Sequence, residues 1–138
     1  METSLDRFII AQEHSYGTAL REIRAGRKRS HWMWYIFPQI AGLGMSHTAQ
    51  FYAIRDIDEA RDYIAHPVLG ARLVEISHAL TELDSSDASA VMGYPDDLKL
   101  CSCMTLFELV SEDEVFGAVL DKFYGGARDT RTLRLLGL

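Results

Sequence analysis

The sequence of 138 residues has no apolar run that approaches the ~18–20 residues needed to span a membrane. Its first residues, METSLDRFIIAQEH, carry early acidic residues and a broken apolar pattern, unlike a secretory signal. Cysteine is also scarce, because Cys101 and Cys103 are the only two. Side chains two positions apart on a helix face different ways, so this pair is poorly placed for a disulfide or a shared metal ion. We therefore expect a cytoplasmic protein with reduced thiols and no membrane partner.

The chain also has fewer basic than acidic residues. Lysine and arginine total 14 against 20 acidic residues, which gives a net charge of −6 with neutral histidines. Nucleic-acid binding depends on neutralising phosphates with basic side chains, so this balance disfavours a nucleic-acid partner. The basic charge is nevertheless concentrated at one place, in Arg24, Arg27, Lys28 and Arg29. A local anion site is therefore compatible with the acidic average.

Motifs of the common enzyme classes are absent. The five histidines include no H-E-x-x-H and no pair at ligand spacing beside a third ligand, so we expect no metal site and no cofactor. No G-x-S-x-G occurs, and the sequence assigns no general base to Ser102, Cys103 or Thr105. The neighbours of Cys103 favour a small buried residue over a reactive thiol. The sequence leaves open whether the protein is an enzyme.

What the chain does contain is apolar residues at helical spacing, with 48% of all residues hydrophobic. This pattern predicts an all-α protein with a single domain over residues 1–138, built as an irregular orthogonal array of about seven helices. One or two further helical turns are expected within 84–93. The predicted helices cover residues 5–25, 46–54, 56–66, 67–83, 95–110, 114–124 and 129–138.

Local signals predict where several of these helices begin and end. Thr3 or Ser4 is placed to cap the first helix, and Gly26 is placed to end it. Aspartate caps are expected at position 56 or 58 and at 129, where Thr130 is the alternative. For the helix over 95–110, the spacing predicts core positions at Leu98, Cys101, Met104 or Thr105, and Leu109.

Residues 26–45, GRKRSHWMWYIFPQIAGLGM, follow no helical period and contain both tryptophans. No second strand-like run is available to pair with them, so we expect an extended, partly buried connection with room for one helical turn. In an extended chain, Trp32, Trp34 and Ile36 would share one face and the residues between them the other. Two interpretations stay open: the aromatic residues fill the core, or one face lines a cleft.

Two further features also have two interpretations each. Residues 42–46, GLGMS, precede a predicted helix and form either an ordinary turn with a serine cap or a loop that holds an anion on backbone N–H groups. Asp96 and Asp97 stand at a predicted helix start. They are either helix caps or a carboxylate pair for acid–base chemistry.

The sequence predicts a cleft around residues 27–46 that binds a small anionic ligand with a flat part, such as a nucleotide. Trp32 or Trp34 would stack on the flat ring of the ligand, and the Gln39 amide would form hydrogen bonds with the edge of that ring. The expected walls are Arg27, Lys28, His31, Trp34, Gln39 and Gly44 on one side, and Asp97, Lys99, Ser102 and Thr105 on the other. Hydrolytic or transfer chemistry would use His31 or Asp97 as base. The alternative is a protein-interaction module, including a homo-oligomer, that uses the same segment without catalysis.

Several segments resemble one family along nearly the whole chain, from Asp6 to about Leu135. They are RFIIAQ, GRKRSHWMWYIFPQIAGLG, YAI, HPVLGARLVE, DDLKLCSCMTLFE and VLDKFYGG. In this order they resemble the bacterial and fungal family known as domain of unknown function 1810, some members of which carry the label calpastatin. The resemblance implies a mainly helical single domain and brings no reaction, cofactor or catalytic residue with it. The family pattern DD-x-KL-x-SSMTLF has serine where this chain has Cys103, which favours a packing role for that position.

Overall fold

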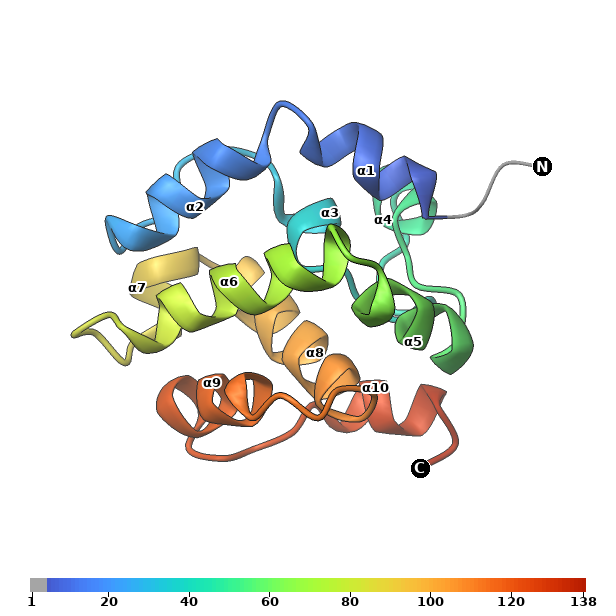
Figure 1. Cartoon of the computed structure of the whole chain (residues 1–138). Coiled ribbons are helices and arrows are strands. Elements are labelled where there is room, and N and C mark those ends of the chain that lie inside the picture. The colour runs from blue at the N-terminus through green and yellow to red at the C-terminus, as the bar shows by residue number, and fades with distance from the viewer. Residues whose placement is uncertain (1–4) are drawn as a thin grey trace.

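The structure is a computed structural model that describes residues 5–138, which form helices joined by turns and loops (Figure 1). Ten helices and one isolated bridge lie within these residues, so the all-α class is confirmed and the expected number of helices is too low. The predicted caps Thr3 and Ser4 lie outside the described residues. The helices are α1 (Asp6–Gln12), α2 (Tyr16–Arg24), α3 (Met33–Ile36), α4 (His47–Phe51), α5 (Ile57–Ala65), α6 (Leu69–Thr81), α7 (Ala88–Met92), α8 (Asp96–Glu108), α9 (Val115–Tyr124) and α10 (Thr130–Leu135).

The predicted first helix is in fact two helices, because residues 13–15 form a turn between α1 and α2. The two halves have different partners: α1 packs on α3, whereas α2 packs on α6. Gln12 ends α1 with a buried side chain that donates to the carbonyl of Tyr35 at 2.8 Å and to the hydroxyl of Tyr63 at 3.0 Å. The apolar residues of this region therefore belong to two separate interfaces. The helical spacing of apolar residues does not show where one helix ends and the next begins.

Most of the predicted boundaries are confirmed. The side chain of Asp56 accepts the backbone N–H of Glu59 at 2.9 Å and caps α5, and Asp129 caps α10 through the N–H of Thr132 at 3.0 Å. Gly26 follows the end of α2 with φ of 82°, a left-handed conformation that favours glycine.

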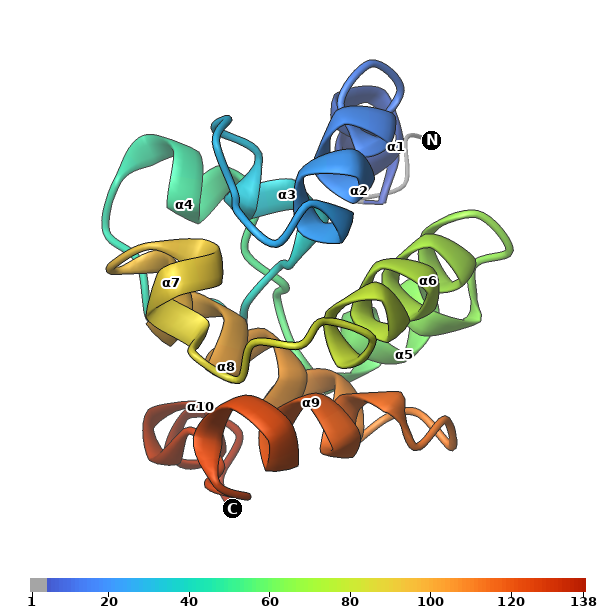
Figure 2. The ribbon, with the colours of Figure 1, turned by 90° about the vertical axis from the view of Figure 1, so that its left-hand side faces the viewer.

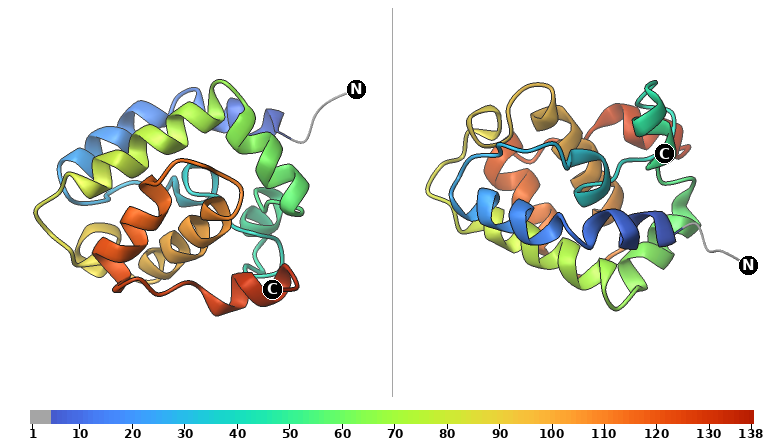
Figure 3. Two further views of the ribbon diagram at one scale, coloured as in Figure 1. Left: turned by 60° about the horizontal axis from the view of Figure 1, so that its bottom comes forward. Right: turned by 90° about the horizontal axis from the view of Figure 1, so that it is seen from above.

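Helix α8 runs through the middle of the molecule, and the views in Figures 2 and 3 agree in placing the other helices around it. It packs against α5, α7, α9 and α10. Residues 102–107 are all buried, so this helix has no polar face along its centre. Leu98 and Leu109, predicted to be buried, are instead 45% and 42% exposed. A helix surrounded on all sides has no amphipathic stripe for the spacing to detect.

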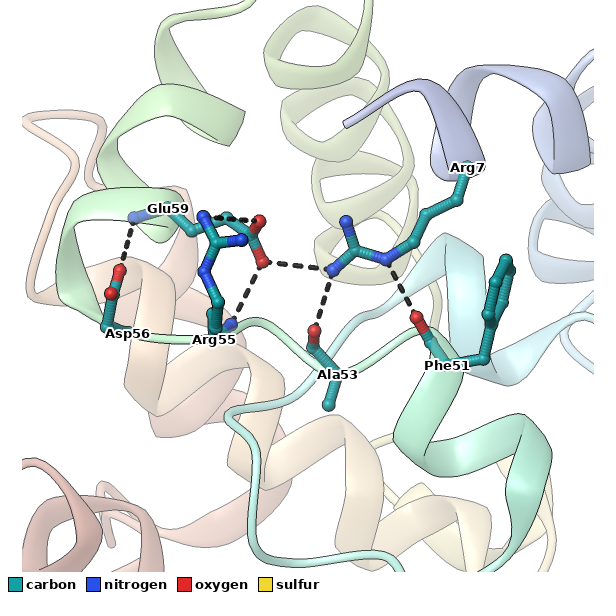
Figure 4. Close-up of polar contacts among 6 residues, drawn as sticks. All are labelled: Arg7, Phe51, Ala53, Arg55, Asp56 and Glu59. Atoms are coloured by element: carbon teal, nitrogen blue, oxygen red, sulfur yellow. Dashed lines mark hydrogen bonds and ion pairs between the residues drawn. The ribbon is translucent and has the colours of Figure 1, made fainter. Parts of the chain in front are cut away.

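A buried ion pair joins helix α1 to helix α5 (Figure 4). Arg7 donates to the carbonyls of Phe51 at 2.8 Å and Ala53 at 2.7 Å, and its Nη2 lies 2.9 Å from Oε1 of Glu59. The Glu59 carboxylate is 1% exposed and also accepts the backbone N–H of Arg55 at 2.9 Å. A buried charge is tolerated only when it is paired and hydrogen-bonded, as it is here.

Within residues 5–138, none of the helices combines the length and the apolar character that crossing a membrane requires.

Replacing Arg7 by methionine is expected to lower the free energy of unfolding by about 3 kcal/mol, because it leaves the buried Glu59 carboxylate with the exposed Arg55 as its cation. Urea unfolding measures this loss. The matched control is Arg61→Met, whose pair with Asp58 has both side chains exposed and should contribute less than about 1 kcal/mol. Equal losses for the two variants would contradict a special role of the buried pair.

Candidate functional site

The tryptophan-rich segment contains the one helical turn for which the sequence left room, α3, and the tryptophans lie at this turn and not in an extended stretch. The expected alternation of faces is therefore wrong: Trp32, Met33 and Ile36 are buried, while Trp34 is only partly buried. Residues three apart share one face of a helical turn, as the buried Met33 and Ile36 do, whereas Trp34 points to another side. The two tryptophans consequently have different environments, one in the core and one at the surface.

Glu22 organises the turn that leads into this segment. Its Oε1 accepts the backbone N–H groups of Arg29 at 2.8 Å and Ser30 at 2.9 Å, and the indole N–H of Trp32 at 2.9 Å. The Ser30 hydroxyl donates to Oε2. Burial alone would raise the pKa of this carboxyl, but the hydrogen bonds from Ser30, Arg29 and Trp32 outweigh it and lower the pKa from 4.5 to about 2. The sequence analysis did not single out Glu22, and the available signal is an acidic residue seven positions before Arg29.

A shared carboxylate connects the two tryptophans. Nζ of Lys28 lies 2.9 Å from Oδ2 of Asp96 and 5.0 Å from the ring centre of Trp32. Nζ of Lys99 lies 3.6 Å from Oδ1 of Asp96 and 5.4 Å from the ring centre of Trp34. Each tryptophan thus carries one lysine over its ring, a favourable cation–π arrangement, and Asp96 bridges the two lysines.

A cleft of about 320 Å³ opens beside Trp34, between the loop before α4 and the first turns of α8 and α10. Figure 2 shows α3, α4, α8 and α10 along one side of the molecule. Apolar side chains from Leu43, Met45 and Leu98 form part of its lining. The remaining lining residues important for chemistry are Trp34, Gln39, Gly44, Ser46, Lys99 and Arg131.

Four of the predicted site residues therefore line one cleft: Trp34, Gln39, Gly44 and Lys99. Arg131 lines the same cleft and was missed. Its signal in the sequence is weak, because only the packing of α10 against α8 brings residue 131 near residue 99.

Three of the predicted residues from the basic and histidine part lie elsewhere. Arg27 is exposed and outside the cleft lining, and Lys28 is turned inward, where Nζ donates to the Ser30 carbonyl at 2.6 Å. His31 lines a separate hollow of about 160 Å³ together with His14. The basic run therefore does not form the expected clamp around the cleft.

Of the four residues expected on the opposite wall, only Lys99 lines the cleft. Asp97 lines a different, open hollow of about 610 Å³, while Ser102 and Thr105 are buried in the core. The Ser102 hydroxyl donates to the Asp129 carboxylate at 3.1 Å, and the Thr105 hydroxyl accepts the backbone N–H of Asp129 at 2.9 Å. These two hydroxyls join α8 to the start of α10, so their role in the structure is packing rather than binding.

The loop of residues 42–46 is an ordinary turn with a serine cap, because the Ser46 hydroxyl accepts the N–H of Ala49 at 3.1 Å. Gly44 lies so close to α4 that a Cβ atom there would be 2.5 Å from Cβ of Ala49. The loop can therefore approach α4 and form the wall of the cleft only with glycine at this position.

Neither cysteine has the properties of a nucleophile. Burial raises the pKa of both thiols, and Cys103 is fully buried. Among the described residues, no three histidine, cysteine, aspartate or glutamate side chains are grouped closely enough to hold a metal ion. The chemistry that the cleft itself offers is two cations, one aromatic ring and one amide.

Residues 2–136 match the family described as Protein of unknown function (DUF1810). The chain belongs to this family. A similar solved structure is that of the conserved hypothetical protein Rv1873 from Mycobacterium tuberculosis, a crystal structure at 1.38 Å. It is 45% identical to this chain, with a TM-score of 0.94 over 97% of this chain and 96% of the other. No curated protein matches the chain. Membership of the DUF1810 family confirms the resemblance seen in the sequence.

The Glu22 hydrogen bonds predict a stability that depends on pH. Because its pKa is lower in the folded protein than the ordinary value of 4.5, its contribution is present above pH 4.5 and is lost as the pH falls towards about 2. Glu22→Gln should therefore lower the free energy of unfolding by about 2 kcal/mol at neutral pH, and the difference from the unmodified protein should shrink in acid. Urea unfolding at several pH values measures this. The exposed neighbour Glu13→Gln is the control, and a loss for Glu22→Gln that stays constant down to pH 2 would contradict the assignment.

Proposed function

We propose that the protein binds a small anionic ligand with a flat ring, such as a nucleotide, in the cleft beside Trp34. The observation that supports this most is that Lys99 and Arg131, from two different helices, line the same cleft as an accessible tryptophan. A volume of about 320 Å³ is at the lower end of the range for small-molecule clefts.

The two cations are loosely paired in the structure, which leaves them available to an anion. Lys99 lies 3.6 Å from Asp96, and Nε of Arg131 lies 3.8 Å from Oδ1 of Asp129. Both distances are longer than those of a strong charge-assisted hydrogen bond, about 2.7–2.9 Å. An anionic group between the two side chains would gain closer contacts than either cation now has.

Trp34 and Gln39 provide recognition of the uncharged part. The Lys99 ammonium already lies over the Trp34 ring, so a ligand ring would pack against the remaining open surface of the indole and the apolar wall of Leu43 and Leu98. The Gln39 side chain has no hydrogen-bond partner among the described residues, so its amide can pair with a donor and an acceptor on a ring edge.

The proposal is limited to binding. His31 and Asp97, the bases that hydrolytic or transfer chemistry would use, lie in other hollows. The hydroxyl that lines the cleft, that of Ser46, accepts the N–H of Ala49 and has no histidine beside it in the lining. A general base must reach the proton that it removes, and none of these groups does so from this cleft.

Isothermal titration with a nucleoside monophosphate, the free nucleoside and inorganic phosphate tests the proposal, because the first compound alone has both the ring and the anion. We expect adenosine 5′-monophosphate to bind more tightly than either part. Lys99→Met and Arg131→Met should each weaken binding by about tenfold or more, since each removes a charged contact worth about 1.5–3 kcal/mol. The free nucleoside should be nearly insensitive to either change.

The matched control is Arg134→Met, which removes a charge from the same helix at an exposed position outside the cleft lining. Its affinity should change far less than that of Arg131→Met, because Arg134 does not line the cleft and its exposed charge is partly screened by salt. Absence of binding by all three compounds at millimolar concentration would reject the proposal.

A second candidate function is protein interaction through the same surface. Met45 is 80% exposed and Leu98 is 45% exposed at the cleft, and apolar side chains of this kind are common in interfaces. This alternative predicts self-association or a retained partner that Met45→Lys weakens. Light scattering over a range of protein concentrations measures it, and a monomer at all concentrations would argue against a homo-oligomer.

A further inference from the structure

Lys28 belongs to the basic run but does not line the cleft, and it is nevertheless connected to it through one carboxylate. We propose that Lys28 sets the preference of the cleft for anions by neutralising Asp96, without touching the ligand. This inference rests on the proposed function, because it concerns how the same cleft attracts its ligand. Lys28 is in this sense a positioning and charge-balancing residue rather than a binding residue.

The Lys28 side chain is fixed in its place. It is 9% exposed and is held on three sides by the Ser30 carbonyl at 2.6 Å, the Asp96 carboxylate at 2.9 Å and the Trp32 ring at 5.0 Å. Ser30 is itself held by Glu22, so the carbonyl that Lys28 contacts cannot move freely. A charge in such surroundings is screened far less by salt than the exposed charge of Arg27.

Asp96 is the negative group that Lys28 and Lys99 share, and it is 19% exposed. Lys28 is the closer partner, at 2.9 Å against 3.6 Å for Lys99. With Lys28 present, the three groups have one positive charge in excess, and Lys99 can offer it to an anion. Without Lys28, Asp96 would have Lys99 alone as its counter-ion, and this pair would have no excess positive charge, which leaves Arg131 as the cation of the cleft.

The connection gives opposite expectations for removing the charge of Lys28 and for removing the charge of Asp96. Removing the charge of Lys28 should make the cleft less attractive to anions, whereas removing the charge of Asp96 should make it more attractive. Both changes weaken the same ion pair, so a loss of stability would affect both variants in one direction. The difference in sign therefore separates this role from a purely structural one.

Quenching of tryptophan fluorescence by iodide and by acrylamide measures the effect directly. Trp32 is 1% exposed, so the quenching reports mainly on Trp34 in the cleft. Iodide is an anion and acrylamide is neutral, so the ratio of their quenching constants at fixed ionic strength follows the local charge. We expect Lys28→Met to lower this ratio about twofold and Asp96→Asn to raise it about twofold. Arg27→Met, the matched change in the same basic run, should leave it unaltered.

Equal ratios for Lys28→Met, Arg27→Met and the unmodified protein would overturn the inference, as would a fall in the ratio for Asp96→Asn. Circular dichroism confirms that each variant is folded, and the Asp96→Asn measurement still decides the question if Lys28→Met does not fold. The iodide measurement needs no natural ligand. It can therefore fail while adenosine 5′-monophosphate binds, or succeed while no nucleotide binds, so this inference and the proposed function are tested separately.

Discussion

The burial of helix α8 is the constraint on which the rest of the structure depends. Residues 102–107 are buried without interruption, so other helices must cover every side of this segment. Helices α5, α7, α9 and α10 pack against it. These helices enclose the centre of α8, which has no side left for solvent. A bundle of a few long helices would instead leave each helix with a polar face.

Two ion pairs, in addition to apolar packing, connect the N-terminal part of the chain to the rest of the fold. Arg7 and Glu59 join α1 to α5, and Lys28 joins the turn after α2 to Asp96 at the start of α8. A buried ion pair is tolerated only with good geometry and further hydrogen bonds, which Arg7 and Glu59 have at this helix contact. Asp96 also pairs with Lys99, which lines the cleft. The same carboxylate therefore contacts both a buried lysine of the fold and a lysine of the candidate site.

The basic and aromatic segment has both of the roles that its sequence left open, divided between neighbouring residues. Trp32 fills the core and donates its indole N–H to Glu22, whereas Trp34 lines the cleft. Lys28 is used inside the protein, and Arg27 remains exposed to solvent. Neighbouring residues of this segment therefore have different surroundings, because the turn over residues 25–32 and helix α3 direct successive side chains to different sides.

The sequence by itself determined the all-α class, the family, most helix ends, and four of the residues that share the cleft: Trp34, Gln39, Gly44 and Lys99. These features depend on local patterns, on caps such as Asp56 and Asp129, and on segments shared with relatives. Only the tertiary structure decided that Arg131 joins the cleft, that Ser102 and Thr105 are core residues, and that Lys28 faces Asp96. It also decided the break between α1 and α2 and the exposure of Leu98 and Leu109. The physical reason is common to all of these: each depends on which helices surround a residue, and a buried helix or a long-range ion pair leaves no period in the sequence.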